Sequence, residues 1–453
     1  MVFVETVTII TSLAVFSALS KTDDGVYELF RISDAFICAF SVDGACRVFI
    51  ALAAFLWPFA TLYAIEYMAH EKREGMFFVC YTLAYAVTIL LAASANLFTM
   101  YIFYECLTVV TIPLVGHEQN KESFRAARTY MVYLIGGASI GFAGMIMANL
   151  HSAAAFSLGG IMGEGAREIL PLRLAYGLAF FGFAAKAAMF PMCRWLPKAS
   201  VAPTPVTALL HAVAVVNAGV FAVLRITYYV FGLEFMRGTY IQTILVLLSA
   251  FSVVYGSMRA LRETHVKRRL AWSTVSNLSY MLIGISIMSV NGMTGALLHM
   301  VFHGLMKIVL FFTAGAILVK TGCTQTYEMR GLARNMPVTF ACFTVCGLAL
   351  IGVPPLAGFF SKYQLIGAAL SENGWQFVVA GASLIVSAIL TAIYIFQIAL
   401  PAYFAKPVHG ERLVNHDPGL PMKLAMIVVT IAVVGASLMS GRLMEIISGI
   451  SSL

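Results

Sequence analysis

Charged residues are scarce in this sequence. Asp, Glu, Lys and Arg together make up 11% of the 453 residues, whereas hydrophobic residues make up 60% and the mean hydropathy is +0.89. A water-soluble domain of this size needs a larger charged fraction to cover its surface. The composition therefore excludes an ordinary soluble protein and predicts an integral membrane protein.

Cysteine patterns that hold metals or disulfide frameworks are missing as well. The eight cysteines are scattered through apolar segments without C-x-x-C or other metal-ligand spacing, and Cys342 and Cys346 are most simply a packing face. The sequence also has no polar stretch long enough for a separate soluble domain. We therefore expect this chain to carry no cofactor, no metal site, no redox chemistry and no nucleic-acid partner.

What the sequence has instead is a succession of apolar runs. A helix needs roughly 20 apolar residues to cross the hydrocarbon core of a bilayer, and runs of this length recur along nearly the whole chain. We expect an all-α polytopic membrane protein with about thirteen transmembrane helices. The expected spans are 2–20, 45–65, 76–94, 97–116, 129–149, 172–190, 203–229, 240–260, 271–289, 294–319, 337–370, 376–404 and 423–448.

Lysine and arginine are distributed unevenly over the loops between these runs. Loops after odd-numbered spans carry four of them, namely Lys21, Arg31, Arg167 and Arg237. Loops after even-numbered spans carry sixteen, namely Lys72, Arg73, Lys121, Arg125, Arg128, Arg194, Lys198, Arg262, Lys267, Arg268, Arg269, Lys320, Arg330, Arg334, Lys406 and Arg412. This bias predicts that the even loops and the N-terminus are cytoplasmic. The cluster Arg262 to Arg269 is expected to anchor the chain near lipid headgroups.

Four ionisable residues lie inside apolar runs, where a charge costs a few kcal/mol or more. They are Glu105 in LFTMYIFYECLTVVTIPL, Lys186 in LAFFGFAAKAAMF, Lys307 in LLHMVFHGLMKIVLFF and Lys362 in GVPPLAGFFSKYQLIG. Burial favours the neutral form of a lysine and a nearby carboxylate favours the charged form, so such lysines suit proton transfer. We pair Lys186 with Glu105, the one carboxylate deep in the first half of the chain. A static ion pair between two helices is the alternative.

Histidines extend this set of polar residues. His299, His303 and Lys307 are spaced i, i+4 and i+8, so they share one face of a helix and predict a proton relay. The alternative is that the two histidines only satisfy neighbouring backbone or hydroxyl groups. For His211, spacing alone leaves packing and relay equally open.

Prolines and glycines predict two broken helices. The prolines from Pro191 to Pro205 follow Lys186, and the stretch Gly352 to Gly358 precedes Lys362. Breaks within a membrane are tolerated where protein or water receives the freed backbone groups, so each break would admit water toward a lysine. Two five-helix repeats of opposite orientation, each with a broken fourth helix, are a transporter signature. The expected division of the chain is N-terminal helices 1–75, a first repeat 76–229, a second, inverted repeat 240–404, and 405–453, a loop and a C-terminal helix.

Four ordered motifs in this chain resemble those of a known family. The runs KAAMFPMCRWLPKASVAPTPVTALLHA, HVKRRLAWSTVSNLSYM, HMVFHGLMKIVLFFTAGAI and GVPPLAGFFSK resemble the antiporter-like subunits shared by respiratory complex I, membrane-bound hydrogenases and multisubunit sodium/proton antiporters. The resemblance covers roughly residues 43–400 and implies a fourteen-helix bundle with inverted repeats and a hydrated polar axis at mid-membrane. The residues that it assigns to this axis are Glu105, Lys186, His211, His303, Lys307 and Lys362, while Asp43 and Gly44 match the start of the family's early helix.

The chain also departs from the family pattern. Cys193 stands where many members have histidine, Lys198 where they often have aspartate, and Glu263 and His265 where glutamine and aspartate are common. All four departures fall in loops expected on the cytoplasmic side, and they leave the central axis intact.

The resemblance implies an ion-translocating role. We expect a proton-translocating or sodium-translocating subunit of a redox-driven complex in a prokaryotic inner membrane, of complex I or hydrogenase type. The implied partners are other membrane subunits and soluble subunits that carry iron–sulfur clusters. The alternatives are a subunit of a multisubunit sodium/proton antiporter, the cation-coupled module of a two-component inorganic solute transporter, and a structural subunit that does not conduct.

Overall fold

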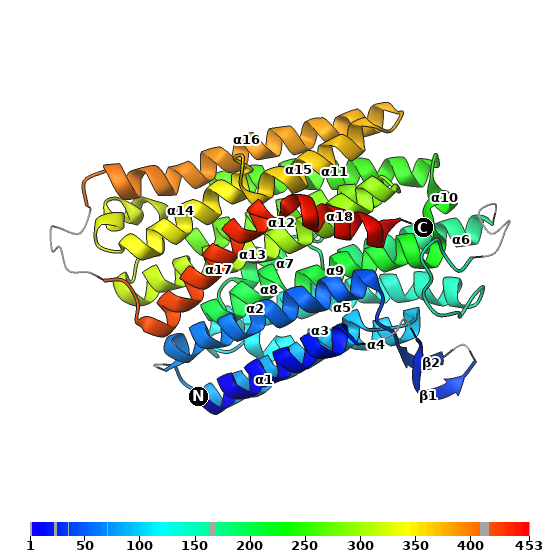
Figure 1. The fold of residues 1–453 in the computed structure, drawn as a ribbon, viewed down its shortest axis with the longest axis horizontal. Helices are drawn as coiled ribbons and strands as arrows, with labels where there is room; N and C mark the ends of the chain where they lie inside the picture. Colours follow the sequence, from blue (N-terminus) through cyan, green and yellow to red (C-terminus); the bar gives the residue numbers. More distant parts are fainter. Residues whose placement is uncertain are drawn as a thin grey trace.

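The computed structural model describes residues 2–21, 25–34, 36–69, 71–162, 169–407 and 416–452. Arg167 and Arg412, which were counted among the loop charges, lie outside these residues. The described chain is mostly helical, and the helices lie side by side along the long axis of the molecule (Figure 1). The first helix begins near the end of the bundle opposite the strands.

The described residues of the first half of the chain form a hairpin of two strands and a series of helices. They are α1 (Val2–Leu19), β1 (Tyr27–Ser33), β2 (Phe36–Phe40), α2 (Gly44–Met68), α3 (Glu74–Ala92), α4 (Leu97–Val115), α5 (Lys121–Asn149), α6 (Leu170–Ala184), α7 (Trp195–Ala199), α8 (Thr204–Ala212) and α9 (Val215–Leu224). A π-helical turn, η2 (Arg225–Phe231), and the short α10 (Leu233–Met236) complete this half.

The second half is built from longer helices. They are α11 (Tyr240–Arg262), α12 (Val266–Ser286), α13 (Val290–Thr321), α14 (Pro337–Ile351), α15 (Ala357–Leu370), α16 (Trp375–Phe404), α17 (Leu420–Leu438) and α18 (Ser440–Ser451). Two 3-10 turns, η3 (Thr326–Met329) and η4 (Leu332–Arg334), connect α13 to α14.

Nine helices of the described residues are long and apolar enough to cross a membrane, with the continuous stretch Thr204–Phe231 counted as one. The chain is therefore a multi-pass membrane protein. Four of the expected spans are not among the nine, each for a visible reason. Phe3–Leu19, Leu170–Ala184 and Pro337–Ile351 are apolar but short, and α12 begins with three basic residues and is buried along nearly its whole length.

The centre of the bundle is α13. It packs against α2, α8, α12, α14, α15, α17 and α18, and 89% of the residues in its apolar stretch are buried. All residues in the apolar stretch of Thr204–Phe231 are buried, whereas only 39% of those in α5 and in α17 are buried. The polar residues of α13 therefore lie in the interior, and α5 and α17 form a portion of the wall that can face lipid.

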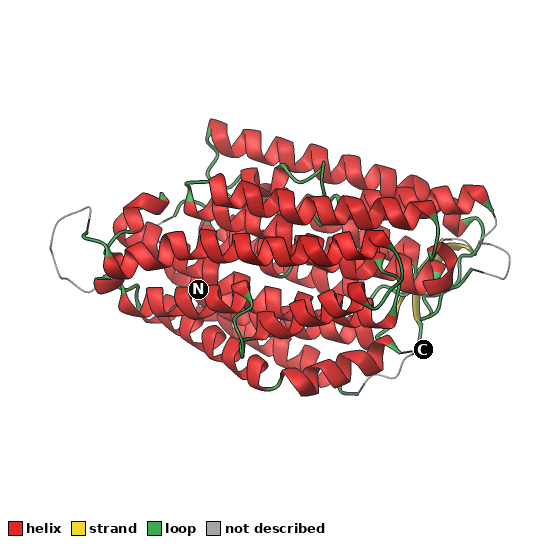
Figure 2. Cartoon of the chain, turned by 90° about the horizontal axis from the view of Figure 1, so that it is seen from above, coloured by secondary structure: helices red, strands yellow, loops and turns green. Residues whose placement is uncertain are grey.

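The expectation of an all-α chain is wrong for one segment. Strands β1 and β2 form an antiparallel hairpin between the first two spans, with Tyr27 opposite Phe40 and Arg31 opposite Ile37. Figure 2 shows the strands at one end of the helix bundle. The segment is too short for a membrane helix, and its backbone groups pair across the hairpin instead.

Two expected spans are interrupted. The run 203–229 breaks at Val213 and Ala214, where the backbone angle φ of Val213 is −132°. The C-terminal run 423–448 also divides, because α17 ends at Leu438 and α18 starts at Ser440. Hydropathy does not reveal the first interruption, since the residues on both sides of Val213 stay apolar, whereas Ser440, Gly441 and Arg442 mark the second.

Both proline-rich and glycine-rich segments break their helices, as expected. Helix α6 already ends at Ala184, two residues before Lys186, and the chain turns until α7 begins. In the second break, α14 ends before Gly352, whose φ of +92° favours glycine, and α15 starts at Ala357. Lys186 therefore lies within its break, while Lys362 lies one helical turn after the other.

Candidate functional site: a buried polar axis

Lys362 is held by the end of the half-helix that precedes it. Its ammonium nitrogen Nζ donates hydrogen bonds to the carbonyl oxygens of Leu350 (2.7 Å) and Ile351 (2.9 Å). These carbonyls belong to the last turn of α14, where the break removes their intrahelical partners. The C-terminal end of a helix carries partial negative charge and suits a cation. The break thus creates the acceptors that hold the lysine.

Lys186 has a similar environment in the first half of the chain. Its side chain is fully buried, and Nζ donates to the backbone carbonyl of Tyr104 on α4. The same ammonium lies 3.5 Å from the centre of the Tyr104 ring, within the range of a cation–π contact. A carbonyl dipole and an aromatic face, both uncharged, therefore receive this lysine.

Lys307 lies in the middle of α13 with no exposed surface. Nζ donates to the carbonyl of Leu270 at 2.9 Å and to the hydroxyl oxygen of Ser273, both on α12. The carbonyl oxygen of Ser273 in turn accepts a hydrogen bond from the side-chain amide of Asn277 at 2.7 Å. A polar face of α12 therefore accompanies the lysine along the bundle.

Hydrogen bonds continue from this face toward Lys362. Asn277 Oδ1 lies 3.2 Å from His299 Nε2, and His299 Nδ1 lies 2.9 Å from the hydroxyl of Ser361. An amide oxygen only accepts, so Nε2 carries the proton, and Nδ1 of the neutral ring accepts from Ser361. Ser361 directly precedes Lys362. The second half of the axis is thus linked by hydrogen bonds from Lys307 to the neighbour of Lys362.

Aromatic contacts strengthen this end of the axis. The ring of Tyr280 is stacked on that of His299, with centroids 5.4 Å apart. Lys362 Nζ lies 5.3 Å from the centre of the Tyr280 ring. His303, one turn before Lys307, lies 6.2 Å from His299 between ring centroids. The predicted stripe of His299, His303 and Lys307 on one face of α13 is therefore present.

Two of the predicted histidines have buried ring nitrogens without a hydrogen-bond partner in the described residues. Both nitrogens of His303 and both of His211 are in this state. The ring of His211, near the end of α8, instead packs on Phe311 with centroids 4.6 Å apart. Lys307 lies close enough to His211 and to His303 to affect both electrostatically. His299 is thus held by hydrogen bonds, whereas His211 and His303 are not.

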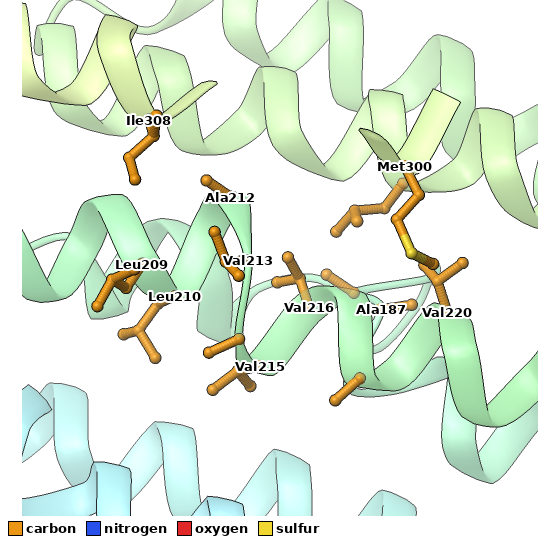
Figure 3. Close-up of a cluster of buried hydrophobic side chains, with 14 of the residues drawn as sticks. Ala187, Leu209, Leu210, Ala212, Val213, Val215, Val216, Val220, Met300 and Ile308 are labelled. Carbon is orange, nitrogen blue, oxygen red and sulfur yellow. The ribbon is translucent and has the colours of Figure 1, made fainter. Parts of the chain in front are cut away.

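Apolar side chains surround the break between α8 and α9. Figure 3 shows Val213, Val215 and Val216 at this break, with Leu210 on one side and Ala187 and Val220 on the other. All of them belong to the main hydrophobic core. Ala187 follows Lys186 in the sequence, and Leu210 precedes His211. Apolar side chains therefore lie at the break next to Lys186 and His211, together with the buried side-chain amide of Asn217 on α9, which donates a hydrogen bond to the carbonyl oxygen of Ala212 at 2.9 Å.

Glu105 is less deeply buried than its position in the sequence suggests. Its side chain is partly exposed on α4, although the oxygen Oε1 is buried without a hydrogen-bond partner among the described residues. Glu105 and Lys186 lie close enough to interact electrostatically. The lysine, however, bonds to the carbonyl of Tyr104 rather than to this carboxylate.

Several polar residues of the interior escape a reading of the sequence. Ser273, Asn277 and Tyr280 recur at i, i+4 and i+7 on α12, which is a helical face and a signal that could have revealed them. The cluster Arg262 to Arg269 is only partly a surface anchor. Lys267 is buried and donates to the carbonyl of Ala202 at 2.8 Å, and Arg269 is buried against Tyr394 and Gln397.

The chain is similar to known membrane proteins. Residues 94–391 match the family described as NADH:quinone oxidoreductase/Mrp antiporter, TM. The chain is 32% identical over 386 residues to NADH-quinone oxidoreductase subunit N of Desulforudis audaxviator. The aligned region covers 82% of this chain and 74% of that subunit. It is 27% identical over 403 residues to subunit L of Escherichia coli, with 86% of this chain and 63% of that subunit covered. The chain thus spans less than two thirds of subunit L.

Two solved structures have the same fold. One is the Mrp complex from Dietzia sp. DQ12-45-1b, with a TM-score of 0.87, 20% identity, and 99% of this chain and 91% of that chain covered. The other is the membrane-bound sulfane sulfur reductase, an archaeal respiratory membrane complex, with a TM-score of 0.85, 21% identity and the same coverage. At this level of identity the likeness concerns the fold alone.

Proposed function

Because the chain belongs to the family of NADH:quinone oxidoreductase and Mrp antiporter membrane subunits, we propose that it is an antiporter-like subunit that moves protons through a larger membrane complex. The chain performs no redox chemistry of its own and needs no cofactor or metal. The observation that carries this proposal is the row of buried lysines and histidines that runs from Lys186 to Lys362.

The proton route follows this row. A proton enters from the cytoplasmic side, reaches Lys186, and passes through His211 and water molecules to Lys307. From there His303, His299 and Ser361 lead to Lys362 and the opposite side. Two features support this route. Hydrogen bonds through Ser273, Asn277 and His299 link Lys307 to Ser361, and the ring nitrogens of His211 and His303, which have no hydrogen-bond partner among the described residues, can each bond to water.

Glu105 acts as the control element of the first half. When the carboxylate approaches Lys186 it stabilises the protonated lysine, and when it moves away the proton is released along the axis. Moving one charge across the membrane costs about 2.3 kcal/mol per 100 mV, a cost within reach of redox chemistry in a partner. A static ion pair is a weaker account, since Lys186 bonds to Tyr104 instead.

The partial exposure of Glu105 supports contact with a partner subunit. A partly exposed carboxylate in the middle of a membrane helix is costly when it faces lipid. A neighbouring membrane subunit on α4 would cover it. The partners of this chain are then other membrane subunits, with soluble iron–sulfur subunits added if the complex is redox-driven.

The finer architecture belongs to the same proposal. The chain crosses the membrane about thirteen times, and 76–229 and 240–404 form two inverted five-helix repeats between the N-terminal segment 1–75 and the C-terminal segment 405–453. The breaks before α7 and between α14 and α15 support this division, because each falls in the fourth helix of its proposed repeat. The N-terminus lies in the cytoplasm and the membrane is the inner membrane of a prokaryote, as the loop charges favour.

The driving reaction is proposed to be a redox reaction, as the similarity to subunits named after NADH-quinone oxidoreductase favours. The second candidate is a multisubunit sodium/proton antiporter, which the similarity of fold to an Mrp complex favours. In that case Thr108 and Thr111 on α4, which are buried near Glu105, could help a sodium ion to pass. A two-component inorganic solute transporter is the remaining alternative.

Purification of the tagged chain in mild detergent, followed by mass spectrometry of the proteins that accompany it, tests the driving reaction. Redox subunits in the purified complex are expected. Recovery with small membrane subunits alone, or with one soluble zinc protein, would instead assign the chain to antiport or solute uptake. In the purified complex, Lys186→Ala should abolish proton transport while the driving reaction continues, and Lys320→Ala, at the partly exposed end of α13, is the matched control.

A further inference from the structure

A basic cavity opens at the end of the bundle that carries most loop lysines and arginines. It has a volume of about 540 Å³ and lies between the first turns of α5, the short α7, the last turns of α11 and the start of α12. Its size is within the range of small-molecule sites. Five cationic side chains line it, namely Arg125, Arg194, Lys198, Arg259 and Arg268.

The carboxylates in this cavity do not balance these cations. Only Glu122 and Glu263 line it as well, so five positive charges face two negative ones. Glu263 is paired with Arg268 at 3.4 Å, and the Arg259 guanidinium carbon lies 5.0 Å from the centre of the Trp272 ring. In the portion of the chain that the structure describes, the side chains of Arg125, Arg194 and Lys198 form no ion pair.

The cavity walls suit a ligand at the boundary between water and lipid. Arg125, Arg194 and Lys198 are exposed, whereas Trp272 is buried beside them and Tyr255 is half-buried. Aromatic rings with one apolar side and one polar side are typical of the interfacial region of a membrane.

We propose that this cavity binds a phosphate-bearing anion, either the headgroup of an acidic phospholipid or a water-soluble phosphate. Four of the five cations are arginines, whose planar guanidinium groups donate pairs of parallel hydrogen bonds that match phosphate oxygens. The surplus of positive charge excludes a metal cation as occupant. The inference does not depend on ion translocation, because none of these residues belongs to the axis from Lys186 to Lys362.

A bound anion would tie together segments that are separate in sequence. Arg125 belongs to α5, Arg194 and Lys198 to the region between α6 and α8, and Arg259 to α11. The segment with Arg194 and Lys198 follows the break at Lys186 directly. The ligand would therefore fix the position of this broken segment against α11 and α5.

The test measures ligand-dependent thermal stability of the full-length protein, purified in neutral detergent with its natural partners and freed of lipid. The probes are phosphatidylglycerol in mixed micelles, phosphatidylcholine in the same micelles, and inorganic phosphate against chloride at equal ionic strength. A ligand that binds only the folded state raises the melting temperature as its concentration increases. The variant is Arg194→Gln with Lys198→Gln. Its control is Lys121→Gln with Arg128→Gln, which removes two exposed cations of α5 outside the cavity.

The expected result is stabilisation by phosphatidylglycerol and not by phosphatidylcholine, with an apparent affinity about 30-fold lower in the cavity variant and nearly unchanged in the control. Stabilisation by inorganic phosphate as well would identify a site open to water, and stabilisation by the lipid alone would identify a headgroup site. Arg125→Gln, on a different helix, should weaken binding in the same direction if the double variant does not fold. Equal responses to the two lipids without stabilisation by inorganic phosphate, equal losses in variant and control, or a protein segment found in the cavity would overturn the proposal.

Discussion

Backbone carbonyl oxygens receive the ammonium groups of the three axial lysines. Lys186 bonds to Tyr104, Lys307 to Leu270, and Lys362 to Leu350 and Ile351. A carbonyl is neutral, so a lysine that gives up its proton leaves no unpaired carboxylate behind. These contacts fit residues that change their protonation state during a transport cycle.

Arg225 illustrates the opposite case. Arg225 is the first residue of η2, and its fully buried guanidinium forms two hydrogen bonds to the carboxylate of Asp43, one of them at 3.0 Å. The rings of Phe221 and Tyr229 cover it, with the guanidinium carbon 4.8 Å and 4.4 Å from their centres. Such a closely packed pair suits a permanent structural charge rather than a relay.

The Arg225 pair gives a prediction about stability. Asp43→Asn leaves a buried guanidinium without its counter-charge, so the free energy of unfolding should fall by about 3–5 kcal/mol. Asp34→Asn removes one of the two carboxylate partners of Arg31 in the exposed hairpin and should change little. Unfolding of the purified protein by sodium dodecyl sulfate in mixed micelles measures both. Equal stability of the two variants would show that the buried pair is not needed.

At the scale of helices, the breaks require close packing that only small residues allow. Gly219 on α9 lies against the turn after α6, and a Cβ atom at this position would be 2.4 Å from the backbone nitrogen of Ala187. The turn that carries Lys186 can therefore approach α9 only because this position has no side chain.

Gly219→Ala should consequently destabilise the protein, since backbone atoms on both sides must move apart. We expect a loss of about 1–3 kcal/mol, which thermal unfolding in detergent measures. Gly367→Ala in α15 is the control, because no atom lies within 4 Å of the added Cβ and alanine favours a helix. If Gly219→Ala melts together with Gly367→Ala, the turn does not depend on this contact.

The apolar side chains at the break between α8 and α9 give a second prediction at this scale. A hydrophobic stretch keeps water out and so blocks proton movement until it is wetted. Val216→Ser should increase the passive proton leak through vesicles that contain the protein, because a hydroxyl group can hold water there. Val223→Ser, also fully buried and two turns further along α9, is the matched control. A leak that rises equally in both variants would contradict a barrier at Val216.

The sequence predicts the candidate residues of the site but not the contacts between them. The seven candidate residues stand out because lysine, histidine and glutamate are conspicuous in apolar runs, with the role of His211 implied only by the resemblance, and the stripe on α13 follows from helical spacing. The pairing of the axial residues with their hydrogen-bond partners could not be found in this way. Tyr104, Asn277 and Ser361 each meet an axial residue of a different segment, and spacing within one helix does not reveal which neighbours fill the space across it.

The limits of hydropathy explain the errors in the fold. Breaks at Pro191 and Gly352 were expected from proline and glycine, whereas the break at Val213 lies in an unbroken apolar run and has no such signal. Helix α12 stays an expected span although it is not among the nine apolar candidates, because protein neighbours rather than lipid surround its polar residues. The hairpin was missed because it is short.

For the whole molecule, the loop charges predict the orientation. Single cysteines at Arg330, in the exposed connection between α13 and α14, and at Tyr27, at the exposed start of β1, should react oppositely with a membrane-impermeant maleimide. We expect Arg330→Cys to be labelled only in inverted vesicles and Tyr27→Cys only in intact cells. The native cysteines are free, so the unsubstituted protein must be labelled in parallel. The reverse pattern would place the N-terminus outside.

Proton transport by the reconstituted complex tests the central claim most directly. Protons moved per turnover of the driving reaction should fall about tenfold or more in Lys307→Ala, because the middle of the axis then has no group that carries a proton. Lys320→Ala, on the same helix but at its partly exposed end, should transport like the unsubstituted protein. Normal transport by Lys307→Ala in a folded complex would show that protons do not use this row of residues.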